Sequence, residues 1–315
     1  MALFAVNPVR AAEIPFESQG AILQWIDQYR LHPKPARLPD AVKALSRFGL
    51  FSGQDKAAFF IGFMAGVIQK NPKSAERLVN KMLPLPDGEQ AVVVKAIAFS
   101  GLADWKVLLT KVEPKLAARK VLITKYLHDD LLPLPALQLD AEPNLLDTLW
   151  GNYYATGGKE PVVQIISALH WAEQDDDVEQ LTIGNAVKWT LAANAARNGT
   201  LLKLYYQQVA EQPLAAATGL QDVIDAVEDF DPERVRRDGQ KVMEAALRKP
   251  AAKPETGSSM TRWATKAGST VISLGCVVAG ATGHAEIAAP CVVAGALYSA
   301  GSSLYFDSPW DTTVR

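Results

Sequence analysis

Apolar residues recur at helical spacing along most of the chain, and sustained alternation of apolar and polar positions is almost absent. Ile22, Trp25, Ile26 and Tyr29 follow an i, i+3, i+4, i+7 pattern, which places them on one face of an α-helix. Ser18 stands where its side chain would cap the first turn of that helix. The pattern as a whole predicts an all-α protein.

The predicted helices are separated by short breaks, such as those at residues 101–102, 157–158 and 198–200. Short breaks make consecutive helices run antiparallel, so the expected unit is a helical hairpin. We therefore expect an irregular α-solenoid of antiparallel helical hairpins. One further helix is apolar on every side, over residues 57–68, and carries Gly62 and Gly66. It is too short to span a bilayer core of about 30 Å, so it predicts a buried central helix that others approach closely.

One hairpin, over residues 149–166, resembles a tetratricopeptide unit, with aromatic residues on its first helix and glycines at its turn. No strict period of about 34 residues, the tetratricopeptide length, runs through the chain. Trp150, Tyr153 and Tyr154 have two interpretations. They could form an interaction surface lining a concave groove, or they could pack in the core, which is the more common role of such residues.

Changes in composition divide the chain into six segments. These are a tail or truncated signal peptide (1–15), an N-terminal helical block (16–127), a proline-containing crossover (128–143), a middle helical-repeat block (144–248), a linker (249–259) and a C-terminal apolar helical hairpin (260–306). The first segment is ambiguous, because its short apolar run follows no basic residue although Val9 and Ala11 fit a cleavage site.

The C-terminal hairpin is rich in Gly and Ala, and residues 267–306 contain a single charged side chain, Glu286. Cys276 and Cys291 lie at equal distances from its turn, so in two closely packed helices they would face each other. A disulfide needs Cα atoms about 4.4–6.8 Å apart, and we expect one here. The alternative is two buried free thiols.

A disulfide requires an oxidising compartment, which favours a periplasmic or membrane-associated location over a cytoplasmic one. Residues 268–306 also raise the question of membrane contact, since aromatic and basic residues flank them. Each apolar run falls short of, or barely reaches, the roughly 20 residues that span a bilayer. Packing against the helical body, or self-association, would account for the same composition.

The composition is that of a folded globular protein, with 49% hydrophobic and 21% charged residues. Lys and Arg number 32 and Asp and Glu 34, so the net charge is −2. This balance argues against nucleic acid as a partner, because neutralising phosphates needs a basic surplus or stripe. Two cysteines exclude a disulfide-dense scaffold and a cysteine-rich zinc module.

Motifs for catalysis and for cofactor or metal binding were not found. The four histidines lack the paired spacing of a zinc site, and the chain has no phosphate-binding glycine loop and no nucleophile elbow. An unrecognised active site would have to converge on His128, Asp129 or His170, whereas Asp177 is expected to cap a helix. We therefore expect no catalytic residues, no cofactor and no metal.

Several segments carry a family resemblance over most of the chain: WIDQYR (25–30), GFMAGVIQKNP (62–72), AIAFSGLADWK (96–106), LLDTLWGNYYATG (145–157), GCVVAGATG (275–283) and PCVVAGA (290–296). Together they resemble a proteobacterial family of exported, all-helical proteins of unknown function. The resemblance implies a full signal peptide and export, and it supplies no activity.

These observations lead to three hypotheses of different classes. The first is a non-enzymatic helical-repeat protein of the cell envelope that binds an unknown protein partner or docks at a membrane. The second is a cytoplasmic helical adaptor or scaffold whose C-terminal hairpin packs in its own core. The third is an enzyme with an unrecognised helical active site.

Overall fold

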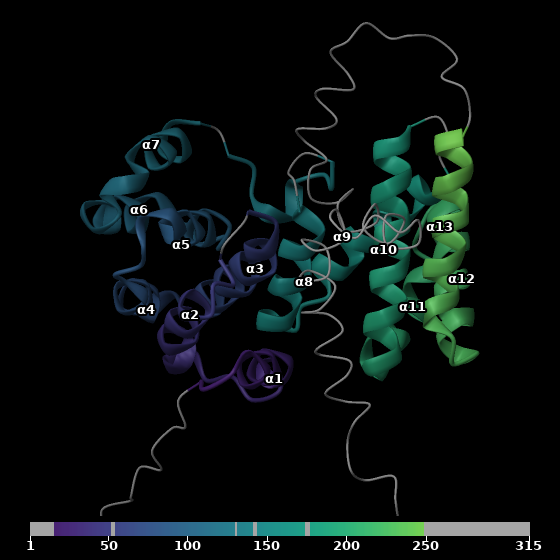
Figure 1. Ribbon diagram of the computed structural model, residues 1–315, viewed down its shortest axis with the longest axis horizontal. Coiled ribbons are helices and arrows are strands. Elements are labelled where there is room, and N and C mark those ends of the chain that lie inside the picture. The colour runs from purple at the N-terminus through teal and green to yellow at the C-terminus, as the bar shows by residue number, and fades with distance from the viewer. Residues whose placement is uncertain (1–15, 52–53, 130, 141–143, 174–176, 249–315) are drawn as a thin grey trace, which may run out of the picture.

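The computed structural model describes residues 16–51, 54–129, 131–140, 144–173 and 177–248 (Figure 1). Within these ranges the chain forms thirteen α-helices and several short 3-10 turns but no strand, so the all-α prediction is confirmed. The helices are α1 (Gln19–Tyr29), α2 (Leu38–Arg47), α3 (Gln54–Lys70), α4 (Ala75–Met82), α5 (Gln90–Ala98), α6 (Trp105–Val112), α7 (Lys120–His128), α8 (Leu145–Thr156), α9 (Glu160–Ser167), α10 (Val178–Arg197), α11 (Gly199–Val209), α12 (Leu214–Glu228) and α13 (Pro232–Arg248).

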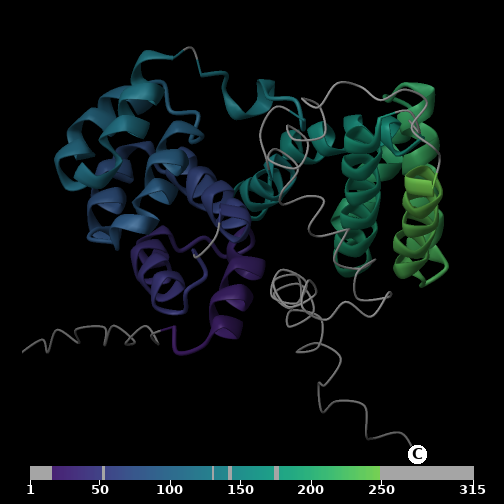
Figure 2. The ribbon, with the colours of Figure 1, turned by 45° about the horizontal axis from the view of Figure 1, so that its top comes forward.

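Helices α2–α7 form two adjoining layers, and α1 packs against α2 and α8. Helices α2, α4 and α6 pack side by side in one layer, and α3, α5 and α7 succeed one another in the other. This group and the group α10–α13 lie on opposite sides of the molecule, with α8 and α9 between them (Figure 1 and Figure 2). The α-solenoid of stacked helical hairpins stays a prediction.

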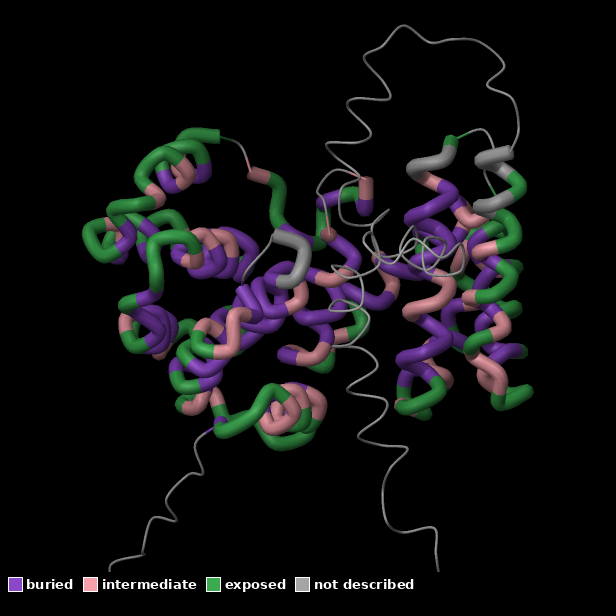
Figure 3. Tube along the Cα trace, viewed as in Figure 1, coloured by how far each residue is buried: buried purple, intermediate pink, exposed green. Residues whose placement is uncertain are grey.

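Helix α3 is the buried central helix that the sequence predicts. Of residues 57–68 only Phe59 is partly exposed, and the side chains of Phe60, Phe63 and Met64 are each at most 2% exposed. Buried positions run along α3, α8 and the inward sides of α10 and α12 (Figure 3). An all-round apolar helix needs neighbours on every side, and α5 and α8 supply two of them.

Helices α3 and α8 cross in direct backbone contact. A Cβ placed on Gly62 would lie 1.8 Å from the carbonyl O of Thr148, and one on Gly151 would lie 1.9 Å from the carbonyl O of Phe59. The Thr148 hydroxyl donates a hydrogen bond to the carbonyl O of Ala58, 3.3 Å away, across the same crossing. The role predicted for Gly62, which is to let another helix approach closely, is thus confirmed.

Helices α10–α13 form a bundle in which α10 contacts each of the other three. The hydroxyl of Tyr205 on α11 donates to the carbonyl O of Leu191 on α10, 3.2 Å away, as expected for an antiparallel pair. A Cβ on Gly239 of α13 would lie 2.7 Å from Oδ1 of Asn185 on α10. These four helices therefore pack as a four-helix bundle, and the repeats predicted for 144–248 stay a prediction.

Local signals place several helix ends. The Ser18 side chain accepts a hydrogen bond from the backbone N of Ala21 at 3.1 Å, and Asp177 accepts one from the backbone N of Gln180 at 3.0 Å. Both residues therefore cap helices as predicted. Helix α8 ends at Gly157, whose φ of 64° is the left-handed value that glycine adopts without a steric penalty.

The predicted crossover begins where α7 ends. Between α7 and α8 the described residues contain one 3-10 turn, Leu134–Ala136. The Gln164 side chain of α9 donates to the carbonyl oxygens of Leu134 and Leu137, at 3.1 and 2.6 Å, and so attaches the crossover to the molecule. The predicted tail (1–15), linker (249–259) and C-terminal hairpin (260–306) lie outside the described residues.

Candidate functional site

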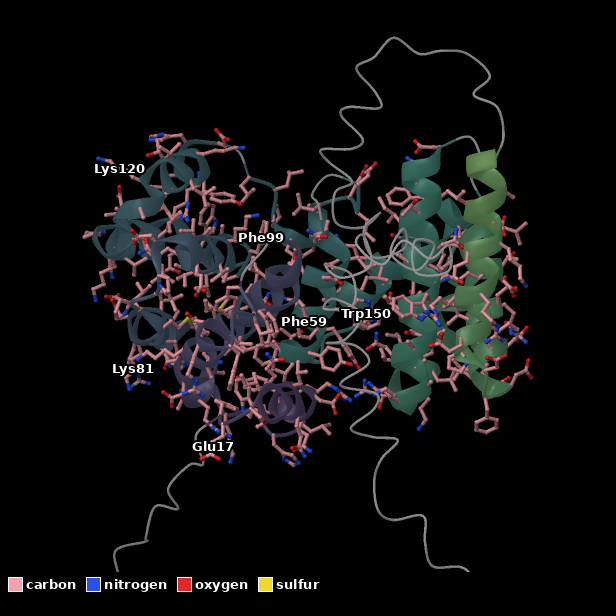
Figure 4. All side chains as sticks on the ribbon, viewed as in Figure 1. Glu17, Phe59, Lys81, Phe99, Lys120 and Trp150 are labelled. Atoms are coloured by element: carbon pink, nitrogen blue, oxygen red, sulfur yellow. The ribbon has the colours of Figure 1, made fainter. Side chains whose placement is uncertain are left out.

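The aromatic residues proposed as an interaction surface lie mostly inside the molecule. Trp150 and Tyr153 are 3% and 4% exposed, while Tyr154 is half-buried. Phe59 and Trp150, labelled in Figure 4, lie close together where α3 and α8 meet. Because Gly62 and Gly151 bring these helices into backbone contact, the α8 side chains beside them are enclosed. Of the two interpretations that the sequence left open, Trp150 and Tyr153 therefore take the second and pack in the core.

Tyr153 is held in a polar environment despite its burial. The Asn198 side chain donates a hydrogen bond to its hydroxyl at 2.8 Å, and the guanidinium carbon of Arg30 lies 5.7 Å from its ring centroid. Burial raises the pKa of Tyr153, while Arg30 and the Asn198 hydrogen bond oppose that rise. The hydroxyl therefore stays protonated at neutral pH and is no base.

Tyr154 links α8 to the bundle. Its hydroxyl donates to Oδ1 of Asn194 on α10 at 2.7 Å. Arg197, one turn further along α10, lies 3.8 Å from a carboxylate oxygen of Asp27 on α1. We call Arg30, Tyr153, Tyr154, Asn194 and Asn198 the polar junction, because these side chains connect α1, α8 and α10. Its arrangement fits a role in holding the two halves together.

An aromatic cluster lies next to the polar junction. Trp25 contacts Phe16, Tyr29 and Phe63 edge-on, with ring centroids 5.2–5.4 Å apart. Tyr29 is 2% exposed, and its hydroxyl has no hydrogen-bond partner among the described residues. Burial raises the pKa of Tyr29 to about 12. An apolar enclosure of this kind favours the neutral phenol.

The residues on which an active site would have to converge belong to separate elements. His128 ends α7 with an exposed side chain, and Asp129 beside it is exposed as well. His170 lies in a 3-10 segment (Ala168–Glu173), where its Nδ1 is 2.6 Å from the carbonyl O of Ser167. Among the described residues, no group of three or more His, Cys, Asp or Glu side chains is arranged to hold a metal ion.

The outer surface of α4 and α6 carries a concentration of cations. Lys73, Arg77 and Lys81 follow one another at four-residue spacing on α4 and the turn before it, and all three are exposed. Beside them lie Lys111, 2.9 Å from a carboxylate oxygen of Glu76, and Lys115, 2.5 Å from Oδ1 of Asn80. We call these five cations the basic face. Figure 4 shows Lys81 at the outer edge of the molecule.

Sequence reasoning from the total net charge missed this surface, although a count by segment would have found it. Residues 16–128 contain 17 Lys and Arg against 9 Asp and Glu, a net charge of +8. Residues 129–231 contain 4 Lys and Arg against 17 Asp and Glu, a net charge of −13. The balance of −2 over the whole chain therefore conceals two strongly and oppositely charged regions.

Comparison with known proteins found no matching family model, no matching curated protein and no matching solved structure. Within the described ranges, no helix combines the length and the apolar character needed to cross a membrane. Cys276 and Cys291, the predicted disulfide pair, lie outside those ranges, as does the segment 268–306 considered for membrane contact.

Proposed function

We propose that this protein is a non-enzymatic helical scaffold of the cell envelope that binds the acidic surface of another protein through its basic face. The single observation that supports this proposal most is the gathering of five exposed cations on α4, α6 and the 3-10 turns beside them, where Glu76 is the only carboxylate among the described residues that forms an ion pair with any of the five. Rows of like charge on packed helices create a potential that attracts and orients an oppositely charged partner.

The charge of the remaining molecule favours a protein over a nucleic acid as that partner. A nucleic acid extends far beyond five cations, and the region 129–231, with its net charge of −13, would repel it. A compact acidic protein surface can contact the basic face alone. The packing of α4 against α6 supports the same view, because it holds the backbone segments that carry these cations side by side.

The basic face can be reversed in charge without touching the core. The variant K73E/R77E/K81E changes three exposed residues and leaves the Lys111–Glu76 pair intact. Glutamates at positions 73 and 77, before and in the first turn of α4, suit the helix dipole, whereas one at position 81 in the last turn opposes it by about 0.3–1 kcal/mol. The two effects nearly balance, so folding should persist. The matched control is K43E/K159E/K203E, which changes the net charge equally at three exposed positions elsewhere.

Each tagged variant, made in the full chain, is used to capture partners from native cell-envelope extract. We expect the wild type and the control to retain an acidic protein that raised salt releases, and K73E/R77E/K81E to bind it at least about tenfold more weakly. Equal retention by both triple variants would refute the proposal. If nuclease treatment abolished the binding, the partner of the basic face would be a nucleic acid. If anionic vesicles bound the basic face in the same way, its partner would be a membrane surface. Either result would refute the proposal of an acidic protein.

The cellular location has a separate test. A resemblance to exported helical proteins and the expected disulfide between Cys276 and Cys291 both support the envelope. Counting free thiols on protein purified without reductant distinguishes the alternatives. A count of zero free thiols favours export, whereas a count of two favours the cytoplasmic adaptor.

A further inference from the structure

Helix α4 and the turn before it carry three cations that no neighbouring carboxylate neutralises. Lys73, Arg77 and Lys81 stand four residues apart, and all three are exposed. We call them the cation row. The Arg77 guanidinium donates a hydrogen bond to the Ser74 hydroxyl at 3.1 Å, but no carboxylate among the described residues forms an ion pair with any of the three. The row lies at the edge of the molecule away from α10–α13 (Figure 1 and Figure 2).

The cation row lowers the stability of α4 in two ways. Arg77 has a like charge four residues before it and another four residues after it, and like charges at that spacing repel each other along a helix. Lys73 and Arg77 also lie before and in the first turn of α4, where the helix dipole disfavours cations. In α13, by contrast, Arg236 and Lys241 each form an ion pair with a carboxylate three residues away. A row of cations that opposes local stability indicates a role other than folding.

The neighbouring edge of α6 has a different character. Lys111 lies 2.9 Å from a carboxylate oxygen of Glu76, and Lys115 lies 2.5 Å from Oδ1 of Asn80. The hydrogen bond to Glu76 and the charge of that carboxylate raise the pKa of Lys111. One turn before Lys111, on the same face of α6, Val107 is 56% exposed. The α6 edge is therefore partly neutralised and carries an apolar side chain, while the positive charge on α4 stays available.

The two edges run in the same direction and repeat at the same distance. Glu76 and Asn80 are four residues apart on α4, and their partners Lys111 and Lys115 are four residues apart on α6 and the turn after it. Four residues of a helix rise about 6 Å. A partner helix has the same repeat and presents two neighbouring rows of side chains, at i, i+4, i+8 and at i+3, i+7. An extended strand presents a single row on each face, whereas this surface has two edges of different chemistry.

We propose that the partner of the basic face contacts it with an acidic α-helix, whose carboxylates stand at i, i+4 and i+8 and pair with the cation row. An apolar row beside those carboxylates covers Val107. This inference rests on the proposed function, because it names the part of the acidic partner that the basic face recognises. Three cations at a fixed spacing select the positions of the partner's charges as well as their sign.

Synthetic peptides test this match without the native partner. The first is a fluorescently labelled, alanine-based helix with glutamates at i, i+4 and i+8 and leucines at i+3 and i+7. The second has the same composition, but its three glutamates are placed around the helix, and circular dichroism verifies that the two peptides are equally helical. The third is the first peptide with a central alanine replaced by proline, which breaks the helix. Binding to the full chain is measured by fluorescence anisotropy at low ionic strength, where exposed ion pairs are least screened.

We expect the first peptide to bind the wild type at least about fivefold more tightly than either of the other two, because it alone can place three carboxylates on three cations. Arg77→Glu should weaken that binding at least about fivefold, whereas the matched reversal Lys203→Glu on α11 should change it less than about twofold. Val107→Ser should weaken it at least about twofold, and the same replacement at the exposed Val121 of α7 should leave it unchanged.

The free protein supplies a second measurement. Arg77→Glu should leave its thermal midpoint unchanged or raise it, since the replacement removes like-charge repulsion and suits the helix dipole. A lowered midpoint would show that the cation row serves folding and would refute the inference.

The peptide results separate this inference from the proposed function. Absence of binding by the first peptide, or equal binding of the first and second, would refute the helical match. Tighter binding of the proline-containing peptide would refute it as well, because the partner segment would then be extended. If an acidic protein were still captured through the basic face, the proposed function would stand after any of these results. Loss of both the capture and the peptide binding would refute the two together.

Discussion

The N-terminal helices and the bundle bring helices together in different ways. Where α3 crosses α8, two glycines, Gly62 and Gly151, let backbone touch backbone. Where α13 meets α10, Gly239 instead faces the side chain of Asn185. The first contact joins groups that cannot move without displacing a whole helix, whereas the second involves a side chain that can change its rotamer.

This difference predicts which glycines can be replaced by a larger residue without loss of stability. The α3–α8 crossing lies among side chains that are almost fully buried, so added volume has nowhere to go. The end of the bundle carries exposed ion pairs such as Asp229–Arg234 and Asp231–Arg237, which contribute little to stability because water and salt screen them. We expect the α3–α8 crossing to be sensitive to single methyl groups and the α10–α13 contact to be tolerant.

The largest effect is expected for Gly62→Ala. The new Cβ would stand 1.8 Å from the carbonyl O of Thr148, so α3 and α8 would have to separate. We expect the free energy of unfolding to fall by about 3 kcal/mol, as for severe overpacking of a core. Urea denaturation followed by circular dichroism measures this fall.

The matched control is Gly199→Ala at the start of α11, where an added Cβ meets no atom within 4 Å. Its stability should be unchanged or higher by up to about 1 kcal/mol, because alanine is the better helix former. If Gly62→Ala proved as harmless as Gly199→Ala, the backbone contact between α3 and α8 would be disproved.

A smaller effect of opposite sign is expected for Tyr29→Phe, also in the N-terminal half. The Tyr29 hydroxyl is buried without a partner among the described residues, so removing it should raise stability by about 1 kcal/mol at neutral pH. Thermal and urea unfolding measure the gain. A loss of stability would mean that the hydroxyl has a favourable partner.

The same variant should change the response to alkaline pH. The pKa of Tyr29 is about 12 in the folded protein and 10.0 without burial. Below pH 10 the phenol is neutral in both the folded and the unfolded protein, so its ionisation does not affect the free energy of unfolding. Between pH 10 and 12 only the unfolded protein ionises, and the free energy of unfolding falls by roughly 1.4 kcal/mol per pH unit. Wild-type stability should therefore decline more steeply than that of Tyr29→Phe between pH 10 and 12.

Local signals in the sequence predicted much of the fold. Ser18 and Asp177 cap helices, and the apolar run at 57–68 is central, because capping and burial depend on neighbouring residues or on one helix alone. Gly62 was recognisable as a site of close approach by its size. Its partner was not, since Thr148 is far along the chain and no pattern pairs the two.

The candidate site was less predictable for the same reason. Whether Trp150 and Tyr153 face a groove or the core depends on which helix covers α8, and that is decided by tertiary packing. Counting charges by segment would have predicted a basic N-terminal region, and the packing of α4 on α6 then shows where its cations gather.

The smallest effect, and the sharpest test of the comparison, is expected for Gly239→Ala in the bundle. The added Cβ would meet Oδ1 of Asn185 at 2.7 Å, close enough to force that side chain to move. Moving it strains the hydrogen bond from Nδ2 of Asn185 to the carbonyl O of Leu181, now 2.8 Å long, which is worth about 1 kcal/mol. The higher helix propensity of alanine raises the free energy of unfolding by a similar amount, so the two effects nearly cancel. Urea denaturation should therefore show a change in the free energy of unfolding of at most about 1 kcal/mol. A loss as large as that of Gly62→Ala would mean that the α10–α13 contact is as rigid as the α3–α8 crossing.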